Sequence, residues 1–224
     1  MACDVAVYGL DIETDTATDG LDPRVGRVLA AAVAGPDGEV VLAHDDEGAL
    51  LRTLDRWLAD LTPGVLVTWN GAAFDLPYLA SRAAINGAEL GLRLELDASI
   101  GLRGDPLPGH EGAYRARWYG HGHLDAFRVF RADVGRTFGL PCGLKAVAGL
   151  VGLDHVDTDP TRVHELEQHA LHTYVASDAR CTRQLALLRW PTAAAAVDRV
   201  PIDRVSVDAL PVAVAPAGTG GDLP

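Results

Sequence analysis

Lysine is almost absent from this sequence, and basic residues as a whole are outnumbered. Of the 19 basic residues only Lys145 is a lysine, and the 31 acidic residues bring the formal net charge to -12. A protein that binds nucleic acid through a broad basic face has the opposite balance, so the charge argues against that class. A narrow site in which metal ions neutralise a phosphate locally is compatible with this charge.

Cysteines and long apolar runs are scarce as well. Cys3, Cys142 and Cys181 are odd in number, lie far apart and form no CxxC pair, so neither a disulfide framework nor a zinc site is predicted. The first apolar run, MACDVAVYGL, has no basic region and stops at Asp11, which argues against a signal peptide or membrane span. We therefore expect a soluble, cytoplasmic protein with no membrane contact.

The order of predicted strands and helices favours the α/β class. Strands are predicted at residues 5–11, 27–34, 39–43, 65–69 and 123–127. Helices are predicted at residues 46–61, 74–86, 127–137, 144–150 and 163–188. An antiparallel three-strand start followed by alternating helices and strands favours a mixed β-sheet, with parallel strands after the first three, flanked by helices.

Two segments depart from this regular pattern. Residues 97–121 are rich in Gly, Arg and Pro, which predicts a long surface insertion. After Trp190, Pro, Ala and Gly accumulate without periodicity, which predicts a disordered tail over residues 191–224. We expect one folded domain over residues 1–190, followed by this tail.

Single carboxylates in the sequence have ordinary explanations when each is taken alone. Asp11 and Glu13, in GLDIETD, occupy alternate positions of a predicted strand and would point to the same side of the sheet, where they could share a metal. Taken alone, such a pair is more often a solvated strand end. Asp75, in NGAAFDLPYL, fits a carboxylate that caps a helix start. Tyr174 and Asp178, in YVASD, share a helix face and would also fit a surface pair.

The combination is more specific than its parts. DIE, NGAAFD and YVASD, in this order, resemble the three exonuclease motifs of the DEDD superfamily. The likeness is to the tyrosine subclass (DEDDy), because the position at which the histidine subclass has its histidine is Thr173 here. The resemblance covers about residues 5–190. Within the superfamily, the chain is most similar to the proofreading exonuclease domains of family B DNA polymerases and their stand-alone homologues, which implies an RNase H-like fold.

Further stretches agree with this resemblance. GHLDAFRVF resembles the strand before the third motif, and GLKAVAGLVGL resembles the family's "LK-x-VA" helix. Trp69 is a mild departure, since tyrosine is common there in relatives.

The resemblance implies a metal-dependent 3′–5′ exonuclease with two divalent cations, Mg²⁺ or Mn²⁺. By the family's pattern Asp11 would bridge both metals, and Glu13 and Asp178 would hold the metal that activates water. Asp75 would support the second metal, and Tyr174 would orient the attacking water. Oxygen ligands suit Mg²⁺ or Mn²⁺ better than zinc.

The expected substrate is the 3′ end of single-stranded nucleic acid, with DNA favoured over RNA. Asn70, Phe74 and Tyr78 are the candidate substrate-binding residues, because bases stack on aromatic side chains. Packing against the sheet explains Phe74 equally well. Contacts from Arg103, Arg115 and Arg117 to phosphates are the less favoured alternative to a solvated loop.

Three alternatives are weighed against this hypothesis. An exoribonuclease would use the same chemistry. A binding module that lost catalysis would share the fold, although a full set of mutually repelling carboxylates argues against it. A chance match would need three coincidences in order. No polymerase region is evident in the 224 residues, so we expect any proofreading role to act in trans or through a protein partner in replication or repair.

Overall fold

A seven-stranded mixed sheet organises the molecule. The computed structural model describes residues 5–102 and 104–197. The strand order is β3-β2-β1-β4-β7-β6-β5. β1 pairs antiparallel with β2 and parallel with β4, which is in turn parallel to β7. β6 pairs antiparallel with both β7 and β5. The strands are β1 (Ala6–Thr14), β2 (Val28–Gly35), β3 (Gly38–Ala43), β4 (Gly64–Thr68), β5 (Leu92–Leu96), β6 (Tyr114–Trp118) and β7 (His121–Asp125).

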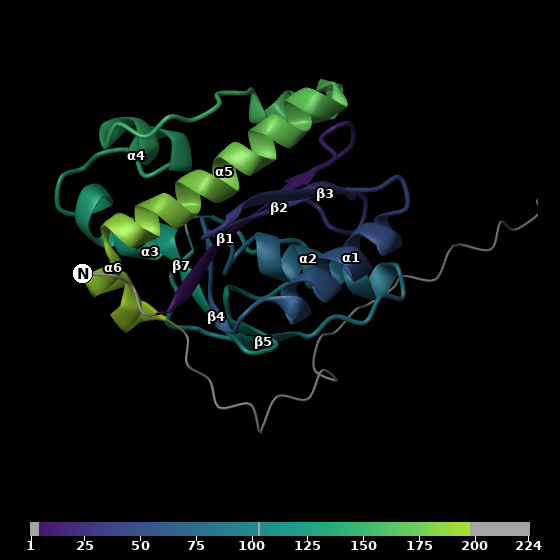
Figure 1. Cartoon of the computed structure of the whole chain (residues 1–224), viewed down its shortest axis with the longest axis horizontal. Coiled ribbons are helices and arrows are strands. Elements are labelled where there is room, and N and C mark those ends of the chain that lie inside the picture. The colour runs from purple at the N-terminus through teal and green to yellow at the C-terminus, as the bar shows by residue number, and fades with distance from the viewer. Residues whose placement is uncertain (1–4, 103, 198–224) are drawn as a thin grey trace, which may run out of the picture.

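Helices cover both faces of this sheet, which confirms the predicted α/β class. α5 crosses one face of β1 and β2, while α1 and α2 lie together on the other face (Figure 1). α3, α4 and α6 lie around the N-terminal end of β1 and the C-terminal half of α5 (Figure 1). The α-helices are α1 (Glu47–Asp60), α2 (Asp75–Ile85), α3 (Ala126–Phe130), α4 (Leu144–Leu150), α5 (Gln168–Leu188) and α6 (Trp190–Ala193). The short helices are the π-helix η1 (Arg131–Gly135) and the 3₁₀ helices η2 (Pro160–Glu165) and η3 (Ala194–Ala196).

The alternation of side chains along β1 assigns each residue to one face. Leu10 and Ile12 are buried in the core that α1 and α2 cover. Because successive strand residues face opposite sides, Gly9, Asp11 and Glu13 face α5. A Cβ at Gly9 would lie 2.0 Å from the carbonyl oxygen of Ala179, so only glycine allows α5 to approach β1 this closely.

The predicted surface insertion at residues 97–121 is wrong in its second half. β6 lies inside it, and β7 begins at its last residue. In β6 the arginines at positions 115 and 117 alternate with buried Tyr114, Ala116 and Trp118, the last of which is 1 % exposed. The segment has the period-two pattern of a half-buried strand, and its high content of Gly, Arg and Pro concealed that pattern.

Two predicted helices are divided, and the predicted tail begins with helical turns. The helix expected at 127–137 is α3 continued by η1, and the one expected at 163–188 is η2 followed by α5. After residue 190, α6 packs through Ala193 against the core and is followed by η3, while residues 198–224 lie outside the described part of the chain. Within residues 5–102 and 104–197, no helix has the length and apolar character needed to cross a membrane.

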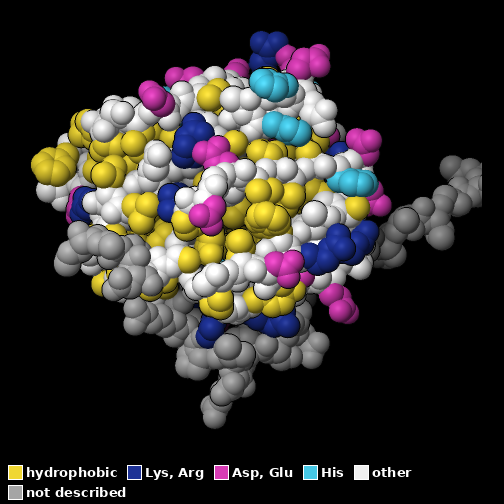
Figure 2. Space-filling view, in the orientation of Figure 1, with side chains coloured by type: hydrophobic (Ala, Val, Ile, Leu, Met, Phe, Trp, Pro, Cys, Tyr) yellow, Lys and Arg dark blue, Asp and Glu magenta, His cyan; other side chains and the backbone are white. Residues whose placement is uncertain are grey.

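Charged side chains are mixed on the face that carries α5. Acidic and basic groups lie beside one another, with hydrophobic side chains between them, and the basic groups form no continuous field on this face (Figure 2). This distribution agrees with the negative net charge. Binding of a polyanion on this face therefore has to depend on a local site.

Candidate active site

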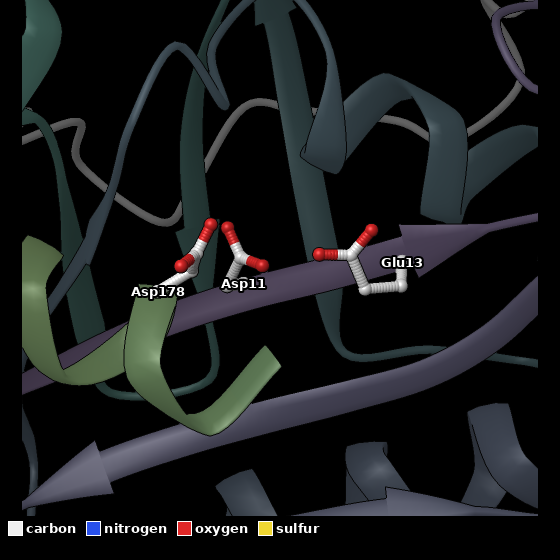
Figure 3. Close-up of side chains that lie close together, drawn as sticks. All are labelled: Asp11, Glu13 and Asp178. Atoms are coloured by element: carbon white, nitrogen blue, oxygen red, sulfur yellow. The ribbon is translucent and has the colours of Figure 1, made fainter. Parts of the chain in front are cut away.

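Three carboxylates converge where α5 crosses β1. Asp11, Glu13 and Asp178 each offer one oxygen, and these oxygens all lie within 4.8 Å of one another. Asp178 extends from α5 toward Asp11, and Glu13 lies further along β1 (Figure 3). Asp178 lies in a different motif from Asp11 and Glu13, 165 positions after Glu13 (178 − 13), and the fold brings the three together.

The local structure explains how each carboxylate reaches the cluster. Asp11 and Glu13 project from the α5 side of β1 because they are two residues apart on a strand. Asp178 immediately precedes Ala179, whose carbonyl oxygen lies over Gly9. The close crossing at Gly9 therefore delivers Asp178 to the strand that carries its two partners.

Asp75 lies beside this cluster rather than within it. It is the first residue of α2 and is 5 % exposed, and the backbone N–H groups of Asp75 itself and of Ile12 lower the pKa of its carboxylate. Ile12 lies between Asp11 and Glu13, so the Asp75 carboxylate faces the same stretch of β1. Its charge raises the pKa of both neighbours, which places it within electrostatic reach of the cluster.

The site concentrates negative charge that is poorly compensated. Burial, followed by the like charges of Glu13 and Asp75, raises the pKa of Asp11 well above its usual value. Burial raises the pKa of Glu13 to about 8 and that of Asp75 to about 7. Buried carboxylates lose hydration and repel one another, and a bound cation reverses both penalties. The oxygen-only set fits a hard divalent cation such as Mg²⁺ or Mn²⁺.

Lys145, which was not among the predicted site residues, adds a positive charge. Its ammonium group forms an ion pair with the Asp178 carboxylate and lies 4.6 Å from the centre of the Tyr174 ring. Tyr174 is 6 % exposed, and burial followed by the charge of Glu13 raises its pKa, so its hydroxyl stays protonated. The available signal was that the only lysine of the chain lies in the GLKAVAGLVGL stretch.

The candidate substrate-binding residues have different surroundings. Asn70 is exposed, with a left-handed φ of 68°, and Phe74 is half-buried at the start of α2. Tyr78 is 0 % exposed, and its ring lies 5.3 Å from that of Phe74. Stacking of a base on Tyr78 is therefore contradicted, because the side chain packs inside the core. Phe74 keeps an accessible surface.

Two of the three candidate arginines lie on a β-strand and not in a solvated loop. Arg115 is on β6 and pairs with Asp97 at 2.8 Å, and Arg117 is on the same strand. Arg103 lies outside the described residues.

Comparison with known proteins agrees with the fold and the motifs. Residues 28–135 match the family model described as DNA polymerase family B, exonuclease domain. This range includes Asp75 and excludes the carboxylates of β1 and α5. The chain is 32 % identical over 150 residues to the catalytic subunit of DNA polymerase epsilon from Saccharomyces cerevisiae, and 29 % identical over 140 residues to a DNA polymerase of Methanocaldococcus jannaschii.

These relatives are much longer than the chain. The alignments cover 65 % and 58 % of this chain but 6 % and 8 % of the two polymerases. The family B DNA polymerase of the archaeon Pyrobaculum calidifontis has a similar fold, with a TM-score of 0.66 at 24 % identity over 85 % of this chain and 25 % of the polymerase. The chain therefore resembles the exonuclease domain of family B DNA polymerases in the sequence of residues 28–135 and in its fold.

Proposed function

We propose that this protein is a metal-dependent 3′–5′ exonuclease that hydrolyses phosphodiester bonds at the 3′ ends of single-stranded nucleic acid, with DNA favoured, and releases nucleoside 5′-monophosphates. The observation that carries the proposal is the convergence of Asp11, Glu13 and Asp178 within 4.8 Å, beside Asp75. Relatedness to a polymerase exonuclease domain supports the reaction type.

Two divalent cations, Mg²⁺ or Mn²⁺, would supply an activated water and neutralise charge on the scissile phosphate. Asp11 would be shared by the two cation positions, because it belongs to the cluster with Glu13 and Asp178 and is also within electrostatic reach of Asp75. Glu13 and Asp178 would complete one position, and Asp75 would support the other from the start of α2.

The remaining groups of the site would orient the reactants. Tyr174 keeps its proton and can donate a hydrogen bond to the attacking water or a phosphate oxygen. The positive charge of Lys145, beside Asp178, would attract the same water or phosphate oxygen. Asn70 and Phe74, at the turn before α2, would hold the terminal nucleotide by polar contact and stacking.

Two competing functions share the fold. An exoribonuclease would use the same carboxylates, and it differs in reading the 2′-hydroxyl. A module that binds without cleaving would have no need to retain a buried carboxylate cluster in which Glu13 and Asp75 raise the pKa of Asp11 and Asp75 raises that of Glu13. A protein partner in replication or repair and a cytoplasmic location are also part of the proposal.

The test compares the two polymers and the variants side by side. Purified protein is incubated with 5′-labelled single-stranded DNA or RNA in Mg²⁺, Mn²⁺ or EDTA. We expect a ladder that shortens from the 3′ end, with DNA cut faster than RNA, and no ladder in EDTA.

Asp178→Asn should abolish the ladder, because it removes a cluster carboxylate. Asp60→Asn, at an exposed position at the end of α1, is the matched control and should retain it. No cleavage of either polymer by folded protein would overturn the proposal, and faster cleavage of RNA would transfer it to the exoribonuclease.

A further inference from the structure

A buried aspartate outside the acidic cluster occupies a junction of three elements. Asp125 is the last residue of β7, is 5 % exposed, and directly precedes α3. It pairs in register with Thr68 at the end of β4. The turn after Thr68 leads to Asp75, so Asp125 lies beside the segment that joins β4 to the start of α2.

The carboxylate of Asp125 accepts three backbone hydrogen bonds. Oδ1 accepts from the N–H of Asn70 at 2.9 Å and of Phe127 at 3.1 Å, and Oδ2 accepts from the N–H of Ala72 at 3.4 Å. The bond from Phe127 is an ordinary helix cap. The other two bonds extend to a turn more than 50 positions earlier in the sequence.

That turn has a conformation that needs external support. Asn70 has φ of 68°, a left-handed value that is uncommon for a residue with a side chain. The N–H groups of Ala73 and Phe74 both donate to the carbonyl oxygen of Asn70. A displacement of Asn70 would therefore be passed to Phe74, and from there to Asp75, which begins α2.

A helix cap alone does not explain why this residue is an aspartate. The side chain is buried near Asp75, and burial raises its pKa, while His123 and Arg128 only partly offset that effect. A serine would cap α3 without a second buried charge. A carboxylate has acceptor oxygens for three N–H groups, whereas the NH₂ of an asparagine would face a donor.

We propose that Asp125 is a positioning residue that holds the 70–74 turn, and thereby sets Phe74 and Asp75 relative to the carboxylates of β1. The inference rests on the proposed exonuclease function for its catalytic consequence. Its structural part, the support of the turn, can be measured without activity.

Two variants separate the turn from the helix cap. Asp125→Ser keeps a short oxygen that can accept from Phe127 and loses the bonds to the turn. Asp125→Asn keeps the size of the side chain but places its NH₂ group against a backbone N–H group, so that two donors face each other. Asp55→Asn is the matched control, because Asp55 is also buried and accepts from the Gly91 N–H at 2.8 Å and the Trp118 indole at 2.7 Å, away from the site.

The experiment measures amide hydrogen exchange of a peptide that spans residues 70–74, together with kcat and KM on single-stranded DNA in Mn²⁺. Both Asp125 variants should exchange at least tenfold faster in this peptide and lose at least tenfold in kcat. Asp55→Asn should change neither quantity. The double variant Asp125→Ser, Asn70→Ala should lose less kcat than the product of the two single-variant losses, because both changes release the same turn.

Each outcome decides a separate part of the inference. Unchanged exchange over residues 70–74 in a folded Asp125 variant would overturn it, and so would faster exchange with wild-type kcat. If wild-type protein does not cleave DNA, the proposed function fails, while the exchange result still decides whether Asp125 holds the turn.

Discussion

Gly9 on β1 lies directly beneath the carbonyl oxygen of Ala179 on α5, and this contact sets the distance between the strand and the helix that carry the acidic cluster. A methyl group at position 9 would lie 2.0 Å from that oxygen. Backbone atoms on both sides cannot move aside as a flexible side chain would. The active-site geometry thus depends on a residue that has no functional group.

The first prediction concerns this contact. Gly9→Ala should push α5 away from β1, lower the free energy of unfolding by about 1–3 kcal/mol, and weaken Mn²⁺ binding, because Asp178 moves with the helix. Urea unfolding and Mn²⁺ titration would measure both effects. Gly104→Ala, where a Cβ meets nothing within 4 Å, is the control. Wild-type Mn²⁺ affinity in Gly9→Ala would contradict the account.

The second prediction is a pH dependence of stability without metal. The pKa of Glu13 is raised to about 8 and that of Asp75 to about 7 in the folded protein, whereas unfolded carboxyls titrate near 4. The folded state therefore binds more protons between these values, and stability falls as pH rises from about 4 to 8. The melting temperature in EDTA should fall over this range.

Divalent metal should remove most of that loss, because it stabilises the ionised carboxylates. The gain in melting temperature on adding Mn²⁺ should therefore be larger at pH 8 than at pH 5.5. Glu13→Gln should flatten the EDTA profile, because it removes one of the titrating groups. A melting temperature in EDTA that rises steadily with pH would contradict the charge balance inferred for the site.

The third prediction concerns Lys145. In the protein without metal its ammonium group is paired with Asp178, so Lys145→Met should lower the melting temperature in EDTA. The difference from wild type should shrink in saturating Mn²⁺, since the metal then compensates the carboxylates. Lys145→Arg keeps the charge and should behave more like wild type in EDTA. An equal loss with and without Mn²⁺ would instead indicate a packing role.

The fourth prediction separates stability from chemistry. Glu47 on α1 accepts from the Val28 N–H at 2.7 Å and pairs with Arg82 on α2, and both charged residues are buried. Glu47→Ala would leave a buried guanidinium unpaired and should cost about 3–5 kcal/mol in urea unfolding. Because the pair lies outside the acidic cluster, Mn²⁺ affinity of the folded variant should stay unchanged. A cost below about 1 kcal/mol would show that the pair contributes little.

Local periodicity and motif order carried the most accurate predictions from the sequence. The alternation along β1 was enough to expect Asp11 and Glu13 on one side of a strand, and the spacing of Tyr174 and Asp178 was enough to expect one helix face. Both expectations depend on geometry within a single element, which the sequence determines locally.

Contacts between elements were harder to predict. Nothing near Lys145 or Asp125 in the sequence indicates Asp178 or the 70–74 turn as a partner, because those contacts arise only when the chain folds. Tyr78 was expected to meet a base, but the side of α2 that it occupies faces the core. The strand β6 was missed because composition was given more weight than its period-two alternation.

The most direct test of the account is the release of the 3′-terminal nucleotide from 3′-labelled single-stranded DNA, measured over one turnover in saturating Mn²⁺ with wild-type protein and with Asp11→Asn. Asp11 belongs to the cluster and faces Asp178, so its charge should be indispensable. We predict that wild-type protein releases the label as a nucleoside 5′-monophosphate and that Asp11→Asn is slower by about 10³-fold or more. Absence of release by folded wild-type protein, or an equal rate in Asp11→Asn, would contradict the account.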